Sequence, residues 1–106
     1  MNNEIIKELF LILKDRKKSG SENSYTSYLI KNHELAAKKI GEESSELIID
    51  LIKKNKGGII RESADLIYHI LVAWISMDIK PEEIWSELSS RMQISGFEEK
   101  KNRDIK

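Results

Sequence analysis

The chain has 106 residues, 40% of them hydrophobic and 34% charged, which favours a single folded domain over residues 1–106 rather than a disordered chain. Its 18 basic and 18 acidic residues cancel, so no global field attracts nucleic acid or an anionic membrane, and a nucleic-acid-binding module is disfavoured. The absence of cysteine excludes disulfides, thiolate metal ligands and thiol nucleophiles. With no cleavage signal and no apolar run long enough to span a bilayer, we expect a cytoplasmic protein.

Hydrophobic periodicity predicts helices along most of the chain. Ile5, Leu9 and Leu13 recur on one face of a first helix over about residues 3–18. A polar run ends this helix, and residues 24–30 then favour a short helical turn.

Two long helices and one shorter helix are predicted after that turn. The first long helix runs from about His33 to Asn55, and Gly57-Gly58 is expected to end it. The second, from about Ile59 to Met77, is apolar on nearly all sides, so we expect it to be buried. Pro81 opens a shorter helix that continues to about Arg91. A charged tail begins at about residue 95.

No segment shows the alternating pattern of a strand, so the predicted class is all-α. The connection between the two long helices is short, and they should therefore pack antiparallel in a helical bundle. A chain of this length buries only a modest core, and we expect a homodimer to complete the bundle.

Acidic residues interrupt the apolar surface of the second long helix. Glu62, Asp65 and His69 fall within an arc of about 60° at about 100° per residue. On the first long helix, Glu43 and Glu46 share an arc of the same width with Asp50 and Lys39. Glutamates at such spacing often form a solvated helix face, and the first helix alone leaves both interpretations open. We interpret His69 as a hydrogen-bonded core histidine in preference to a ligand.

If the two helices pack antiparallel, Glu43 and Glu46 can face Glu62 and Asp65. Burying unpaired carboxylates costs several kcal/mol each, and like charges repel strongly where the dielectric constant is low. Hard divalent cations relieve both effects, and Mg²⁺ prefers oxygen ligands. We therefore hypothesise a Mg²⁺ site, with more than one ion, that acts on a polyphosphate. One of these four carboxylates, or Glu42, would accept the proton of the attacking water.

These acidic pairs also resemble a known pattern. Glu42-Glu43-x-x-Glu46 followed by Glu62-x-x-Asp65 is similar to the signature of the all-α nucleoside triphosphate pyrophosphohydrolases, which include MazG-type and dimeric dUTPase-type enzymes. Further segments occur in the order found in the phosphoribosyl-ATP pyrophosphohydrolase family. They are Ser24-Tyr25-Thr26, Lys38 to Glu43, Glu62 to His69, and Ser95-Gly96-Phe97-Glu98-Glu99-Lys100 with Arg103. The resemblance spans roughly residues 4–103.

This resemblance implies hydrolysis of 1-(5-phosphoribosyl)-ATP to 1-(5-phosphoribosyl)-AMP and pyrophosphate, the second step of histidine biosynthesis. It also implies Mg²⁺ as cofactor, a homodimer and a cytoplasmic location. The residues that match the family's metal ligands are Glu43, Glu46, Glu62 and Asp65, and Glu42 matches an additional acidic position.

The resemblance also implies residues that bind substrate. Lys38, Lys39, Lys100 and Arg103 match basic positions of the family and are expected to contact phosphate. Tyr25 and Thr26 are expected to order the chain beside the substrate, although helix capping and core packing would also explain them.

Two other functions remain open at this point. A house-cleaning pyrophosphohydrolase for non-standard nucleotides would share the metal site and differ in the pocket for the base and ribose. A non-enzymatic helical regulatory dimer would instead bury a polar network and be indifferent to Mg²⁺ and phosphates.

Overall fold

Five helices make up the part of the chain that the computed structural model describes, residues 3–19 and 25–92. In chain order they are α1 (Asn3–Ser19), α2 (Tyr25–Lys31), α3 (His33–Ile52), α4 (Lys56–Ser76) and α5 (Pro81–Arg91). No strand occurs in these two ranges, which confirms the all-α class. None of these five helices is long and apolar enough to cross a membrane. The charged tail expected from about residue 95 lies outside the described residues.

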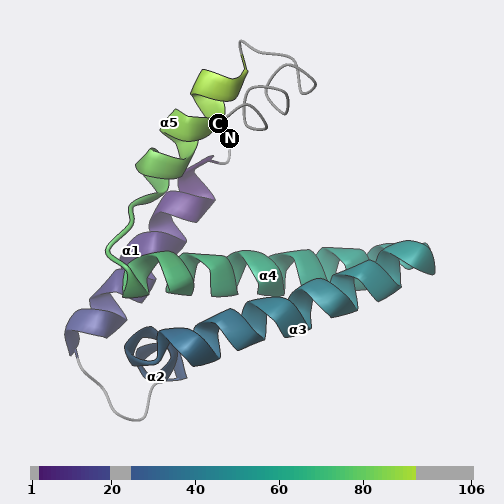
Figure 1. Ribbon diagram of the computed structural model, residues 1–106, viewed down its shortest axis with the longest axis horizontal. Coiled ribbons are helices and arrows are strands. Elements are labelled where there is room, and N and C mark those ends of the chain that lie inside the picture. The colour runs from purple at the N-terminus through teal and green to yellow at the C-terminus, as the bar shows by residue number, and fades with distance from the viewer. Residues whose placement is uncertain (1–2, 20–24, 93–106) are drawn as a thin grey trace, which may run out of the picture.

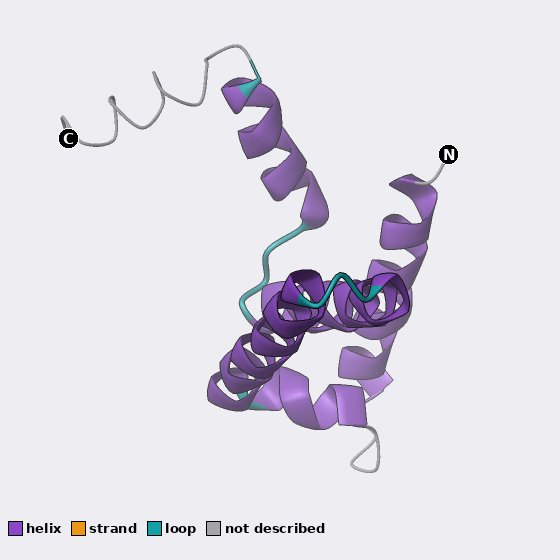
Figure 2. Cartoon of the chain, turned by 90° about the vertical axis from the view of Figure 1, so that its right-hand side faces the viewer, coloured by secondary structure: helices purple, strands orange, loops and turns teal. Residues whose placement is uncertain are grey.

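Helices α3 and α4 form an antiparallel hairpin along the longest axis of the molecule (Figure 1). The other helices gather at one end of this hairpin, and its turn projects away from them. The first half of α1 and the whole of α5 project from the same side of the hairpin, apart from one another (Figure 2). The antiparallel packing of α3 against α4 confirms the predicted pairing of the two long helices.

The turn of the hairpin does not lie where the sequence placed it. We expected the first long helix to run to Asn55 and Gly57-Gly58 to end it, but α3 ends at Ile52 and both glycines lie in the first turn of α4. Lys54 takes the positive φ of 57° that the reversal needs. The side chain of Asn55 then caps α4 by accepting a hydrogen bond from the Gly58 N–H, 3.2 Å away.

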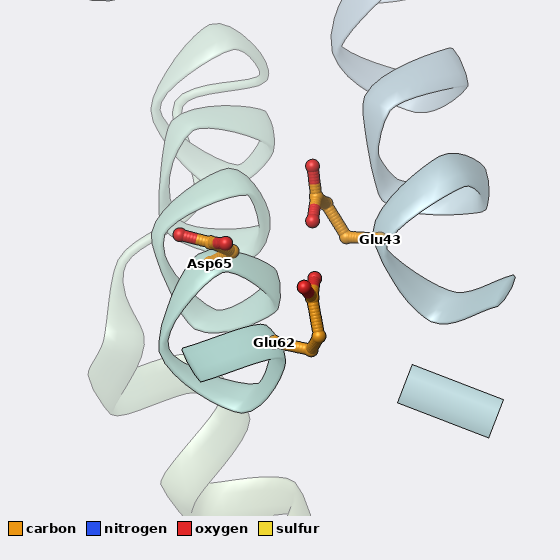
Figure 3. A group of neighbouring side chains, drawn as sticks. All are labelled: Glu43, Glu62 and Asp65. Atoms are coloured by element: carbon orange, nitrogen blue, oxygen red, sulfur yellow. The ribbon is translucent and has the colours of Figure 1, made fainter. Parts of the chain in front are cut away.

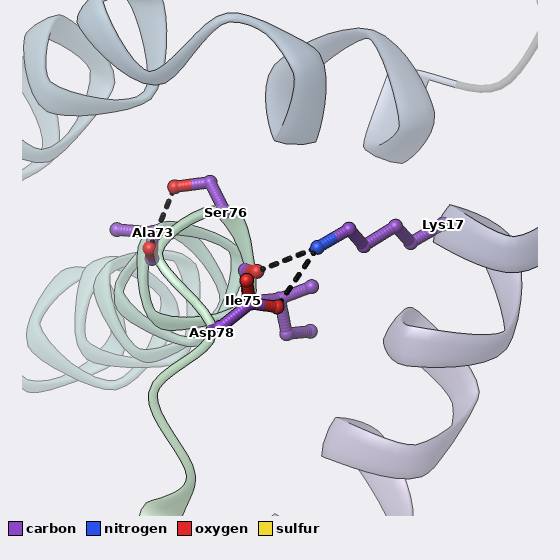
Figure 4. Close-up of polar contacts among 5 residues, drawn as sticks. All are labelled: Lys17, Ala73, Ile75, Ser76 and Asp78. Carbon is purple, nitrogen blue, oxygen red and sulfur yellow. Dashed lines mark hydrogen bonds and ion pairs between the residues drawn. The ribbon is translucent and has the colours of Figure 1, made fainter.

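The hydrophobic core lies at the end of the hairpin where α1 and α2 pack against α3 and α4. Four helices supply its buried side chains, which are Phe10, Leu13, Leu29, Ile30, Ala36, Leu71, Val72 and Ile75. Lys17 of α1 also joins this end to α4 (Figure 4). Its Nζ donates to the Ile75 carbonyl oxygen at 3.3 Å and pairs with Asp78 at 3.2 Å, which places a cation at the C-terminal end of α4, where the helix dipole favours it.

The expectation that the second long helix is buried on nearly all sides is wrong for the single chain. Ile60 is 70% exposed and Ile67 is 41% exposed. Apart from Gly58, its buried residues lie in the last two turns, because α1 and α2 pack near the C-terminal end of α4 and leave its N-terminal half covered by α3 alone (Figure 1).

Candidate metal centre

Three carboxylates meet in the middle of the α3–α4 hairpin. Glu43 reaches from α3 toward Glu62 and Asp65, which lie one turn apart on α4 (Figure 3). One oxygen from each carboxylate lies within 4.8 Å of the others. The helical spacing explains the arrangement, because residues three apart share a face and the hairpin turns that face toward α3. We call Glu43, Glu62 and Asp65 the acidic cluster.

Two oxygens of the acidic cluster have no hydrogen-bond partner although they are buried. These are Oε2 of Glu43 and Oε2 of Glu62. A buried carboxylate oxygen without a partner destabilises the fold, because this oxygen has lost its hydrogen bonds to water and accepts none from the protein in their place. Asp65, in contrast, is exposed. The cluster therefore combines one carboxylate at the surface, Asp65, with two carboxylates inside the hairpin that each have one oxygen without a partner.

Glu46, the fourth expected residue of the site, lies beside Glu62 but is itself exposed. The Glu46 carboxylate raises the pKa of Glu62 to about 7, first by hydrogen bonding to its protonated form. Desolvation of Glu62 and its hydrogen bond with Glu43 raise this pKa further, and repulsion from both carboxylates adds to the effect. Without a cation, the pKa of Glu62 is therefore raised toward neutral pH.

This donor set fits a hard divalent cation. All of its ligand atoms are carboxylate oxygens, the type that Mg²⁺, Ca²⁺ and Mn²⁺ prefer over softer metals. A cation between them would give the two buried oxygens the partners they lack and would displace the proton from Glu62.

Comparison with known proteins identifies the family of this chain. Residues 6–92 match the family model of phosphoribosyl-ATP pyrophosphohydrolase. The chain belongs to this family. Among its relatives, the phosphoribosyl-ATP pyrophosphatase of Clostridium novyi is 39% identical over 98% of this chain and 96% of its own length. That of Geotalea daltonii is 41% identical over 98% and 99%, and that of Saccharolobus solfataricus is 42% identical over 86% and 98%.

The matched range includes every acidic residue that the sequence singled out, Glu42, Glu43, Glu46, Glu62 and Asp65. Lys100 and Arg103 lie beyond that range and outside the described residues.

Lys39 and Glu42 form an ion pair one turn from the acidic cluster. Lys39 Nζ lies 3.3 Å from Glu42 Oε2. The hydrogen bond and charge of Glu42 raise the pKa of Lys39, and Tyr25 and Glu43 contribute as further neighbours. Lys39 is therefore a cation at the edge of the cluster, whereas Lys38 next to it is exposed on α3.

His69 is a hydrogen-bonded core histidine, as we interpreted it from the sequence. Its side chain is buried, and Nδ1 lies 2.8 Å from the Asp65 carbonyl oxygen. It is not a member of the acidic cluster. On the other edge of the ring, Nε2 lies 3.4 Å from the hydroxyl of Tyr25, whose side chain is half exposed.

Thr26 occupies a different position from Tyr25, although the two are neighbours on α2. It is buried and shares a 2.5 Å hydrogen bond with the hydroxyl of Tyr68. This bond fixes α2 on α4. The sequence did not single out Tyr68, because nothing local distinguishes a core tyrosine that needs a hydrogen-bond partner from one that does not.

Proposed function

We propose that this protein hydrolyses 1-(5-phosphoribosyl)-ATP to 1-(5-phosphoribosyl)-AMP and pyrophosphate in the cytoplasm, as the second step of histidine biosynthesis. The observation that carries the proposal is the pair of buried, partnerless carboxylate oxygens of Glu43 and Glu62 inside a chain that matches this family over residues 6–92. Such a cluster can hold a cation between protein and polyphosphate.

The cofactor in this proposal is Mg²⁺, held by Glu43, Glu62 and Asp65 with Glu46 beside them. When bound, Mg²⁺ neutralises phosphate charge and lowers the pKa of a water ligand. Helices α3 and α4 present the clustered carboxylates already facing one another, which limits the reorganisation needed during the reaction. Glu46 lies beside Glu62 and Glu42 directly precedes Glu43 in α3, and we assign one of these two residues to accept the proton of the attacking water.

The substrate side of the site in this proposal starts at Lys39. Its ammonium group at the edge of the cluster suits a phosphate oxygen, and we assign further substrate contacts to the exposed Lys38 and the half-exposed Tyr25. Thr26 contributes indirectly, because its bond to Tyr68 holds α2 against α4. Lys100 and Arg103 complete the proposed phosphate contacts from the C-terminal tail.

The functional unit in this proposal is a homodimer. Large apolar side chains remain more than half exposed around the far end of the hairpin, and they are Ile48, Ile49, Leu51, Ile52 and Ile60. A patch of this kind marks an interaction surface, and a second copy covers it with the same residues. Sedimentation analysis of the wild type and of Ile52→Glu tests this part, with Lys7→Glu on α1 as the matched surface change. A wild type that sediments as a monomer at micromolar concentration would contradict it.

Turnover of phosphoribosyl-ATP, dUTP and ordinary triphosphates in the presence of Mg²⁺ tests the reaction. We expect phosphoribosyl-ATP to give the highest kcat/KM, with pyrophosphate and not phosphate as the released product. Higher kcat/KM for dUTP or another triphosphate would favour the house-cleaning function instead. Calorimetry with Mg²⁺ and a non-hydrolysable triphosphate addresses the regulatory alternative, which requires that neither ligand bind.

A further inference from the structure

His69 is a buried polar side chain to which the proposed reaction assigns no role. It is 7% exposed and packs edge-on against two tyrosine rings. Its ring centroid lies 4.9 Å from that of Tyr68, at an interplanar angle of 89°, and 6.3 Å from that of Tyr25, at 84°. The two tyrosines restrict rotation of the imidazole, and its two nitrogens face fixed partners.

The partner of Nδ1 determines the tautomer. A carbonyl oxygen can only accept a hydrogen bond, so the 2.8 Å contact with the Asp65 carbonyl requires that Nδ1 carry the hydrogen. In the neutral imidazole Nε2 is then an acceptor. The hydroxyl of Tyr25, 3.4 Å from Nε2, must donate to it.

This donation fixes the direction of the Tyr25 hydroxyl. Its hydrogen points to His69, so only its lone pairs are left for other partners. The side chain of Tyr25 is half exposed, and His69 joins its hydroxyl to the backbone of Asp65, a residue of the acidic cluster.

We propose that His69 is a positioning residue: by accepting the hydrogen bond from the Tyr25 hydroxyl, it fixes this group on the substrate side of the site with only its lone pairs left for other partners. The role in substrate binding rests on the proposed function. We expect an effect on KM, because the Tyr25 hydroxyl lies beside the clustered carboxylates and not among them.

The same two helices provide a matched control. Thr26 and Tyr68 share a hydrogen bond between α2 and α4, as Tyr25 and His69 do, but Thr26 is buried and cannot contact a substrate. Tyr68→Phe keeps the ring that packs on His69 and removes one hydrogen bond between these helices. If His69 served only to fix α2 on α4, Tyr68→Phe and His69→Phe would change the kinetics alike.

Nitrogen NMR of histidine-labelled protein tests the geometry without any substrate. We expect His69 to show the Nδ1–H tautomer, with a Nε2 resonance that shifts in Tyr25→Phe and not in Tyr68→Phe. The exposed His33 is the internal reference. An Nε2–H tautomer, or a Nε2 resonance unaffected by Tyr25→Phe, would overturn the inference. Because this readout needs no turnover, it separates failure of the inference from failure of the proposed reaction.

Steady-state kinetics test the consequence. Loss of one neutral hydrogen bond changes an equilibrium by roughly three- to tenfold, so His69→Phe and Tyr25→Phe should each raise KM by roughly this factor, with kcat within about twofold. The double variant should do little more than either single variant. His69→Gln, whose amide oxygen can accept from Tyr25, should recover part of the loss. Additive effects, or equal effects in Tyr68→Phe, would show that His69 is only structural.

Discussion

The close contact between Gly58 of α4 and Asp50 of α3 predicts an unusual response to alanine at Gly58. A Cβ atom added there would lie 2.5 Å from Cγ of Asp50 and 2.6 Å from both of its carboxylate oxygens. At Gly41, in contrast, an added Cβ would meet nothing within 4 Å. Both glycines lie in long helices, so Gly41→Ala is the matched control for Gly58→Ala.

The expected magnitudes follow from these distances. Alanine is better than glycine inside a helix by about 1 kcal/mol, so Gly41→Ala should raise the free energy of unfolding by up to about 1 kcal/mol. Gly58→Ala should gain the same helix propensity, but its added Cβ should displace the side chain of Asp50. That displacement costs about 1 kcal/mol for the 3.3 Å hydrogen bond from Asn55, and about 1–2 kcal/mol for strained packing. The net result is a loss of about 1–2 kcal/mol.

Thermal unfolding by circular dichroism measures both variants. In a domain of about 100 residues 1 kcal/mol shifts Tm by about 4–8 °C, so the two substitutions should move Tm in opposite directions. Because Gly58 lies one turn before Glu62, Gly58→Ala should also weaken Mg²⁺ binding in calorimetry.

Asp50→Ala removes the carboxylate with which the added Cβ would clash. In that background Gly58→Ala should become neutral or stabilising. The reasoning is refuted if Gly58→Ala stabilises the wild type as Gly41→Ala does, or if its penalty persists without the Asp50 carboxylate.

Two further predictions concern the acidic residues. Glu46→Gln and Asp65→Asn should keep the circular dichroism spectrum and lower kcat/KM at least roughly a hundredfold. The control variants Glu34→Gln and Asp15→Asn, at exposed positions outside the site, should keep the kcat/KM of the wild type. Wild-type turnover in both site variants would exclude the proposed centre. The pKa of Glu62 is raised from 4.5 to about 7 in the fold. The protonated carboxyl group of Glu62 therefore stabilises the metal-free protein below pH 4.5, and this stabilisation is lost as the pH rises through about 7. Melting curves recorded between pH 4.5 and about pH 7 should show a fall in Tm with rising pH in the wild type and not in Glu62→Gln. Saturating Mg²⁺ should suppress this fall. An equal change of Tm with pH in both proteins would contradict the assigned pKa.

The sequence predicted the parts of this structure that follow from helical periodicity. Glu43 and Glu46 on one helix, and Glu62 and Asp65 on the next, had to share faces once the helices formed. The short connection made those faces meet. Three of the four carboxylates do lie together, while the exposure of Glu46 depends on the rotation of α3, which the spacing does not specify.

Features that depend on tertiary contacts could not be predicted in this way. Lys54 adopts a positive φ that glycine adopts much more readily, so the Gly57-Gly58 pair was the natural but wrong choice for the turn. The Asn55 cap could have been found, since asparagine before a helix start is a capping signal. The contact between Tyr25 and His69 joins residues 44 positions apart, and no local pattern indicates it.

The position of the acidic cluster relative to the core suggests where a cation would act on stability. Between residues 37 and 68 the only buried residue is Gly58, so this part of the hairpin holds two partnerless carboxylate oxygens with little apolar burial to offset them. It should therefore open more readily than the end that carries Leu71, Val72 and Ile75. Hydrogen exchange should show fast exchange of amides near Glu43 and Glu62 without metal, and slower exchange there with Mg²⁺, because a ligand stabilises the state it binds. Equal slowing at both ends, or none at either, would mean that the cation is not held by this half of the hairpin.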